Sequence, residues 1–148
     1  MVTIIVVLGL AIPVLLNMWA GVAWRSGRTE ALAEATFYAQ ELMEEVKSKD
    51  FVDPQEPTNT NLGPNGGESS SNKDTFDDVD DFMGCTDSLV TTPATGYTRS
   101  VVVGYVTLSG NSWVSSGSPT PFKRIQVTVS RTDNLAKDVS LITVVAAY

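Results

Sequence analysis

Histidine is absent from the 148-residue chain, and Cys85 is its only cysteine. The lack of histidine removes the commonest general base and the commonest metal ligand of enzymes. A lone cysteine excludes an intrachain disulfide, and we interpret Cys85 as a packed thiol rather than a reactive one. We therefore predict that the protein is not an enzyme and that it binds no cofactor.

Basic residues are also few. Ten Lys and Arg side chains are outnumbered by 17 Asp and Glu, which gives a formal net charge of −7 and a pI of about 4.4. Nucleic-acid binding through a basic surface requires clustered Lys and Arg, so we expect no nucleic-acid partner. The length allows one domain, and about 100 residues remain for a globular head if the first ~50 form a rod.

Charge is missing altogether from Met1–Trp24. About 20 apolar residues suffice for a helix to cross a bilayer. The run is too long for the central region of a signal peptide, and no positive segment precedes it. The helical pattern continues to about Asp50, which predicts one rod about 75 Å long. No domain of this size can bury such a rod, so residues 1–24 are predicted as a transmembrane or filament-core helix with a hinge at Gly9 and Pro13.

The second half of the rod, residues 25–52, is amphipathic. Apolar or small side chains recur at alternating intervals of three and four residues, which is typical of a narrow helical packing seam. The seam consists of Leu32, Ala35, Ala39, Leu42 and Val46. Asp53-Pro54 and Pro57 are expected to end the helix.

Residues 53–95 are predicted as a long loop, because Pro, Asn, Thr, Gly and Ser dominate its first half. Its second half carries an acidic cluster, Asp74, Asp77, Asp78, Asp80 and Asp81. Closely spaced carboxylates could hold Ca²⁺, but the spacing is not that of an EF-hand and no glycine occupies the turn position. We interpret the cluster as a solvated loop in which Asp side chains cap a turn or short helix, and we predict no metal site.

Residues 96–148 show the alternating pattern of β-strands. Strands are predicted at 97–108, 122–131 and 139–148, with a Gly/Ser/Pro turn at 109–120 that carries Trp113. The inward-facing side chains are Val101, Val103, Tyr105, Ile125, Val127 and Val129. Such strands form an antiparallel meander, for which the amphipathic half of the helix is the candidate cover. The predicted fold class is α+β: a long N-terminal α-helix packed on a C-terminal antiparallel β-sheet of three or four strands.

Three segments resemble the type IV pilin and pseudopilin family. They are VTIIVVLGLAIPVLLNM (2–18), AEATFYAQELMEEVKSKDF (33–51) and TFDDVDDFMG (75–84). The first is similar to the hydrophobic rod that follows the peptidase cut in prepilins. The family's mature chain opens with Phe or Met, then Thr-Leu, and has a glutamate at the fifth place. Here positions 1–5 read MVTII, so we expect Met1 to lie about five or six residues inside the mature chain.

This resemblance implies a structural subunit of an extracellular type IV pilus-like filament that serves adhesion, motility or surface attachment. Its partners would be copies of itself, the prepilin peptidase and the inner-membrane assembly machinery, and it would reside in the inner membrane before it reaches the cell surface. The expected polymerisation core is Ile4, Ile5, Val7, Leu8, Leu10, Ile12, Val14, Leu15, Leu16, Met18, Trp19 and Trp24.

Three alternatives stay open. The chain could be a minor or tip pilin, with an adhesive patch on loop 53–73 or on the Trp113 turn. It could be a type II secretion pseudopilin, which the same seam and rod would suit. It could also be a membrane-anchored β domain that does not polymerise.

Overall fold

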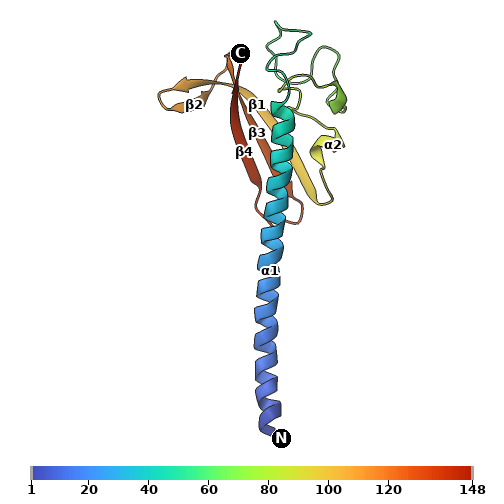
Figure 1. Ribbon diagram of the computed structural model, residues 1–148, viewed down its shortest axis with the longest axis vertical. Coiled ribbons are helices and arrows are strands. Elements are labelled where there is room, and N and C mark those ends of the chain that lie inside the picture. The colour runs from blue at the N-terminus through green and yellow to red at the C-terminus, as the bar shows by residue number, and fades with distance from the viewer. Residues whose placement is uncertain (1, 148) are drawn as a thin grey trace.

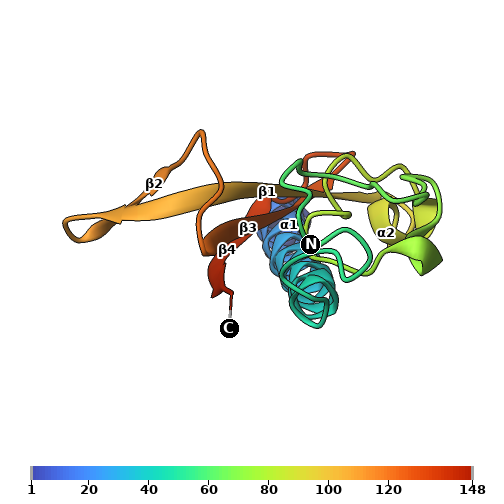
Figure 2. The same cartoon turned by 90° about the horizontal axis from the view of Figure 1, so that it is seen from above.

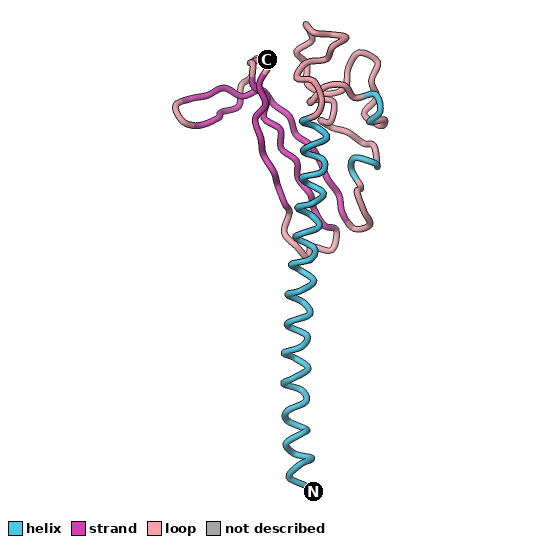
Figure 3. Tube along the Cα trace, viewed as in Figure 1, coloured by secondary structure: helices cyan, strands magenta, loops and turns pink. Residues whose placement is uncertain are grey.

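The structure is a computed structural model that describes residues 2–147, with side chains described for residue 7 and from residue 9 onward. One long helix is followed by loops, two short helical turns and four strands (Figures 1 and 3). In chain order these are α1 (Val2–Lys47), η1 (Lys73–Thr75), α2 (Ser88–Thr91), β1 (Tyr97–Ser109), β2 (Ser112–Ser115), β3 (Phe122–Arg131) and β4 (Val139–Ala146). The predicted α+β class is confirmed.

Helix α1 passes through both parts of the predicted rod without a break. Its C-terminal half lies against the sheet, and its N-terminal half extends alone beyond the head (Figure 1). The helix ends at Lys47 rather than near Asp50. The Ser48 and Lys49 N–H groups close the last turn on carbonyls of the preceding residues, and Asp50 pairs with the loop instead, donating to Asp77 O at 3.2 Å.

The four strands form one antiparallel sheet in the order β2-β1-β3-β4. Strand β3 has the predicted bounds, and β1 and β4 differ from theirs by one or two residues. Strand β2 was not predicted. Its four residues pair with the end of β1 across a turn at Gly110, whose φ of 60° suits glycine. This β1–β2 hairpin projects sideways from the head (Figure 2).

The core lies between the C-terminal half of α1 and the sheet. Ile125, Val127 and Val129 of β3 are fully buried, as the alternation predicted, and Val101 and Val103 of β1 are buried as well. The helix contributes five apolar side chains to the same cluster: Ala35, Ala39, Leu42, Met43 and Val46. The predicted cover of the sheet by this half of the helix is therefore confirmed.

One seam position differs from the prediction. Leu32 is 46 % exposed, and Ala31 is buried in its place. Among the described side chains of α1, the buried ones begin at Ala31 and continue at Ala35, so the spacing there is four rather than three. Leu32 lies at the edge of the head instead, where it faces the turn that joins β3 to β4 without being buried by it.

Candidate functional site

The N-terminal part of α1, which we call the stalk (residues 7–24), is exposed at every side chain that the structure describes. Every residue from 9 to 26 is exposed. The exposed fractions of its large apolar side chains range from 49 % for Ile12 to 74 % for Trp19. Nine members of the expected polymerisation core belong to this surface: Val7, Leu10, Ile12, Val14, Leu15, Leu16, Met18, Trp19 and Trp24. The other three, Ile4, Ile5 and Leu8, lie outside the described side chains.

The stalk is apolar around its whole circumference rather than along one stripe. A helix that is hydrophobic on all sides is normally buried on all sides. At about 25 cal/mol per Å² of apolar surface, covering it is worth on the order of tens of kcal/mol, as an upper estimate. Among the described residues, no helix combines the length and the apolar character needed to cross a membrane.

Gly9 and Pro13 lie within unbroken helix. Pro13 cannot donate the backbone hydrogen bond that would reach residue 9. A Cβ added at Gly9 would have no neighbouring atom within 4 Å, so the fold of one subunit does not require glycine there. The expected loss of helical hydrogen bonding at these residues concerns the assembled state and stays a prediction.

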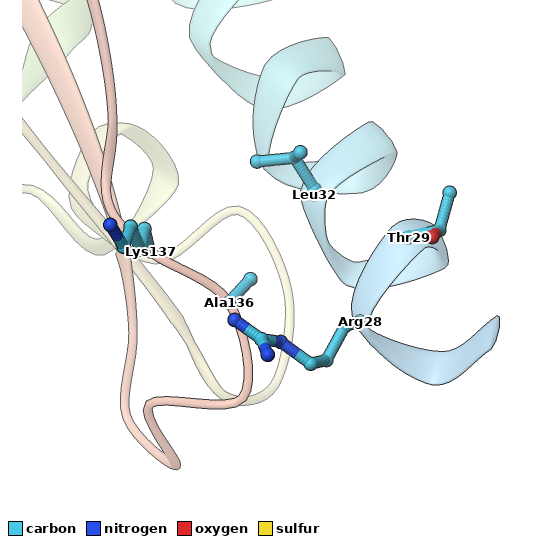
Figure 4. A pocket seen from close by; sticks show the side chains of 5 residues that line it. All are labelled: Arg28, Thr29, Leu32, Ala136 and Lys137. Carbon is cyan, nitrogen blue, oxygen red and sulfur yellow. The ribbon is translucent and has the colours of Figure 1, made fainter. Parts of the chain in front are cut away.

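The helix leaves the head beside two shallow hollows. One, of about 270 Å³, lies between α1 and the turn that joins β3 to β4 (Figure 4). Arg28 and Leu32 reach toward that turn, which carries Ala136 and Lys137. The other, of about 280 Å³, is lined by Ala23, Trp24, Gly27 and Leu135. The exposed apolar surface of the stalk therefore continues onto the base of the head.

The acidic cluster is not the solvated loop that was expected. Asp78, Asp80 and Asp81 are each at most 2 % exposed, Asp77 is half-buried, and Asp74 alone is exposed. The capping role is confirmed. Asp81 Oδ2 accepts from the Asp77 N–H at 2.9 Å and the Asp78 N–H at 2.8 Å, and Asp78 Oδ1 accepts from the Asp80 N–H at 2.7 Å. These bonds fold the segment into a compact turn against the sheet.

Two residues near this cluster were missed in the sequence. Lys123 of β3 pairs with Asp80, and Glu68 lies beside Asp77 and Asp81. The burial of Lys123 could have been predicted, because it lies two residues before Ile125 and so faces the same side of β3. Glu68 carried no such pattern, since it lies in irregular chain.

Burial dominates the electrostatics of this region. It raises the pKa of Glu68 to about 7, and the neighbouring carboxylates of Asp81 and Asp77 add to the rise. Burial, with the adjacent Asp80 carboxylate, raises the pKa of Asp78 to about 7. The loop thus holds two carboxyl groups, those of Glu68 and Asp78, in surroundings that disfavour their charged forms.

Comparisons of the chain with protein-family models, with curated proteins and with solved structures give no match. Two unusual features of this molecule therefore bear on its function. One is the uncovered stalk, and the other is the buried acidic loop.

Proposed function

We propose that the protein is the structural subunit of a type IV pilus-like filament and that it polymerises through the stalk. The observation that carries this proposal is the contrast along α1. Its C-terminal half completes the core of the head, whereas the stalk presents an apolar surface that no described residue of the same chain covers. The resemblance of residues 2–18 to the hydrophobic rod of prepilins supports the same assignment.

Other copies of the stalk are the best cover for it. A stalk apolar on all sides needs neighbours on all sides, which one partner in a dimer does not supply. Repeating one contact with a fixed rotation and rise gives an open helical polymer. In that arrangement the stalks pack at the centre and the heads form the outer wall.

The hollows at the base of the head fit this arrangement. Trp24 and Leu135 line the place where the stalk meets the head. A neighbouring stalk displaced along the filament axis would pass this region and bury those side chains. Gly9 and Pro13 would then allow local adjustment of the helix during packing.

Before assembly the stalk needs a different apolar environment. We place the subunit in the inner membrane at that stage, where the assembly machinery and the prepilin peptidase would act on it. After polymerisation the protein would be extracellular, as a filament that serves adhesion, motility or surface attachment. The resemblance and the apolar character of the stalk support this proposed localisation.

Electron microscopy of the full chain after detergent removal tests the proposal. We expect long filaments whose reconstructed maps place the stalks at the centre. In a Cys85→Ser background, Leu16→Cys should then form crosslinks between subunits, whereas Ser71→Cys on the exposed loop serves as the control position. A map with stalks on the outside, or with each stalk folded back around its own head, would contradict the proposal.

A minor or tip subunit is the second candidate, and the β1–β2 hairpin favours it. The hairpin extends away from the helix and exposes Leu108 (57 %), Trp113 (41 %) and Val114 (42 %). Trp113 packs on Phe122 with ring centroids 5.0 Å apart, which holds the hairpin in place. Short, capped or absent homopolymers would support this candidate, whereas the absence of any stalk crosslinks would indicate an anchored domain that does not polymerise.

A further inference from the structure

We propose that the loop between α1 and β1 binds one divalent cation, Ca²⁺ in preference to Mg²⁺, through Glu68, Asp77 and Asp81. The geometry of the three carboxylates carries the proposal. One oxygen from each lies within 4.8 Å of those of the other two. Ligands at 2.3–2.6 Å from one Ca²⁺ ion can be at most about 5.2 Å apart, so a single ion can contact all three.

Each carboxylate uses one oxygen to hold the loop. Asp81 Oδ2 accepts two backbone N–H groups. Glu68 Oε2 accepts the Asn65 N–H at 3.0 Å, and Asp77 Oδ2 accepts the side-chain amide of Gln55 at 3.0 Å. These hydrogen bonds fix the three carboxylates before any ion arrives, which is how a preorganised cation site is built.

The second oxygen of each carboxylate is buried and has no hydrogen-bond partner in the described chain. These atoms are Asp81 Oδ1, Asp77 Oδ1 and Glu68 Oε1. Asp81 is 0 % exposed, and its carboxylate belongs to the same close group as those of Glu68 and Asp77. A buried polar atom without a partner costs about 1–3 kcal/mol, and more if it is charged. Three neighbouring carboxylates that each carry such an atom call for a positive ligand.

No ion pair among the described side chains supplies that positive charge. Among residues 2–147, none of the ion pairs involves Glu68, Asp77 or Asp81. The buried cation of this region, Lys123, already pairs with Asp80 and donates to the carbonyl of Phe51. A metal ion would compensate the three carboxylates without any rearrangement of these pairs.

The donor set selects the type of ion. The converging atoms are all oxygens, which suit hard cations such as Ca²⁺ and Mg²⁺ rather than zinc. Asn65 offers a fourth oxygen, since its Oδ1 is also buried without a partner and its N–H already binds Glu68. Irregular loop chain with several carboxylates favours Ca²⁺, because Mg²⁺ requires near-ideal octahedral geometry and keeps most of its waters.

Bound Ca²⁺ would tie the loop to itself and to the sheet. Asp77 and Asp81 flank Asp80, which pairs with Lys123 of β3. Any ion that binds only the folded state raises its stability by RT ln(1 + [L]/Kd). The site therefore makes the order of the head depend on the external concentration of Ca²⁺, whether or not the protein forms filaments.

The test is calorimetric titration of Ca²⁺ into the EDTA-treated full chain in detergent micelles, with thermal unfolding measured in parallel. We expect one Ca²⁺ per chain and a rise in Tm. Glu68→Gln and Asp77→Asn should each weaken Ca²⁺ binding by at least about tenfold, because each removes a ligand charge. Asp74→Asn is the matched control, since it removes the same charge from the exposed member of the cluster and should leave the affinity unchanged.

Circular dichroism without metal checks that the variants fold. Two ligand variants are used so that misfolding of one still leaves the comparison intact. The proposal is overturned if the wild-type chain gives neither heat nor a Tm shift at millimolar Ca²⁺. It is also overturned if the ligand variants bind as the control does, and equal responses to Mg²⁺ would overturn the preference for Ca²⁺.

Discussion

Lys123 of β3 and Asp80 of the acidic loop form an ion pair in which both side chains are only 2 % exposed. The same ammonium group donates to the carbonyl of Phe51 at 2.5 Å and lies 4.7 Å from the centroid of the Phe51 ring. A single cation thus joins the sheet, the chain just after α1 and the acidic loop. This pair positions the loop on the head.

Replacing Lys123 by Met should destabilise the head strongly. The change leaves the buried Asp80 carboxylate without its cation, and breaking a buried pair from one side typically costs about 3–5 kcal/mol. Urea unfolding of a fragment comprising residues 25–148 measures the cost, because the buried hydrophobic core among the described residues begins at Ala31. Lys47→Met is the control, since the Lys47–Glu44 pair is exposed and should contribute less than about 1 kcal/mol. Equal losses in the two variants would contradict this prediction.

Ala39 tests how closely α1 packs on the sheet. It is fully buried at the centre of the seam, so Ala39→Leu should force helix and sheet apart and cost about 1–3 kcal/mol. Ala33→Leu introduces the same side chain on the exposed side of the same helix and should be close to neutral. Thermal unfolding of the two variants of residues 25–148 gives the comparison. If Ala39→Leu were as stable as Ala33→Leu, the contact between helix and sheet would not be closely packed.

Periodicity predicted the regular part of this fold well. Alternation over residues 122–131 identified the bounds of β3 and its buried face, because one side of that strand contacts α1 and the other does not. Four of the five seam residues of the helix are buried for the same reason. The exception, Leu32, lies at the edge of the head. The contact with the sheet ends there, so an apolar residue in the seam pattern is no longer buried.

The acidic loop could not be predicted in this way. Its aspartates are buried through hydrogen bonds to backbone groups of the loop itself and through Lys123, which is distant in sequence. Arg99 is a similar case: its side chain is buried between α1 and α2, where it pairs with Glu41 at 2.9 Å and donates to the Leu89 carbonyl at 3.0 Å. Composition marks such residues as exposed, because charged groups are buried only where partners converge on them.

Cys85 should react slowly with thiol reagents in the folded protein. Burial raises the pKa of the thiol, so less of it is thiolate at neutral pH. The side chain also packs against the hydrophobic core. We expect alkylation by iodoacetamide at pH 8 to be at least about tenfold slower in the folded chain than in urea. In a Cys85→Ser background, Ser71→Cys is the exposed control and should be alkylated at nearly the same rate in both conditions. If Cys85 of the folded protein were alkylated as fast as in urea, the thiol would not be packed.

Removing residues 1–24 should separate folding from assembly. The buried hydrophobic residues among those described all follow the stalk, so residues 25–148 should keep the circular dichroism and cooperative unfolding of the head. The fragment should sediment as a monomer without detergent, while the full chain should associate or require detergent.

Within the full chain, Leu10→Lys and Leu16→Lys should prevent polymerisation, because each places a charge in the proposed stalk bundle. Leu89→Lys, at a 65 % exposed position on α2, is the matched control and should leave polymerisation intact. If the lysines at positions 10 and 16 left filament formation unchanged, the stalk could not be its core.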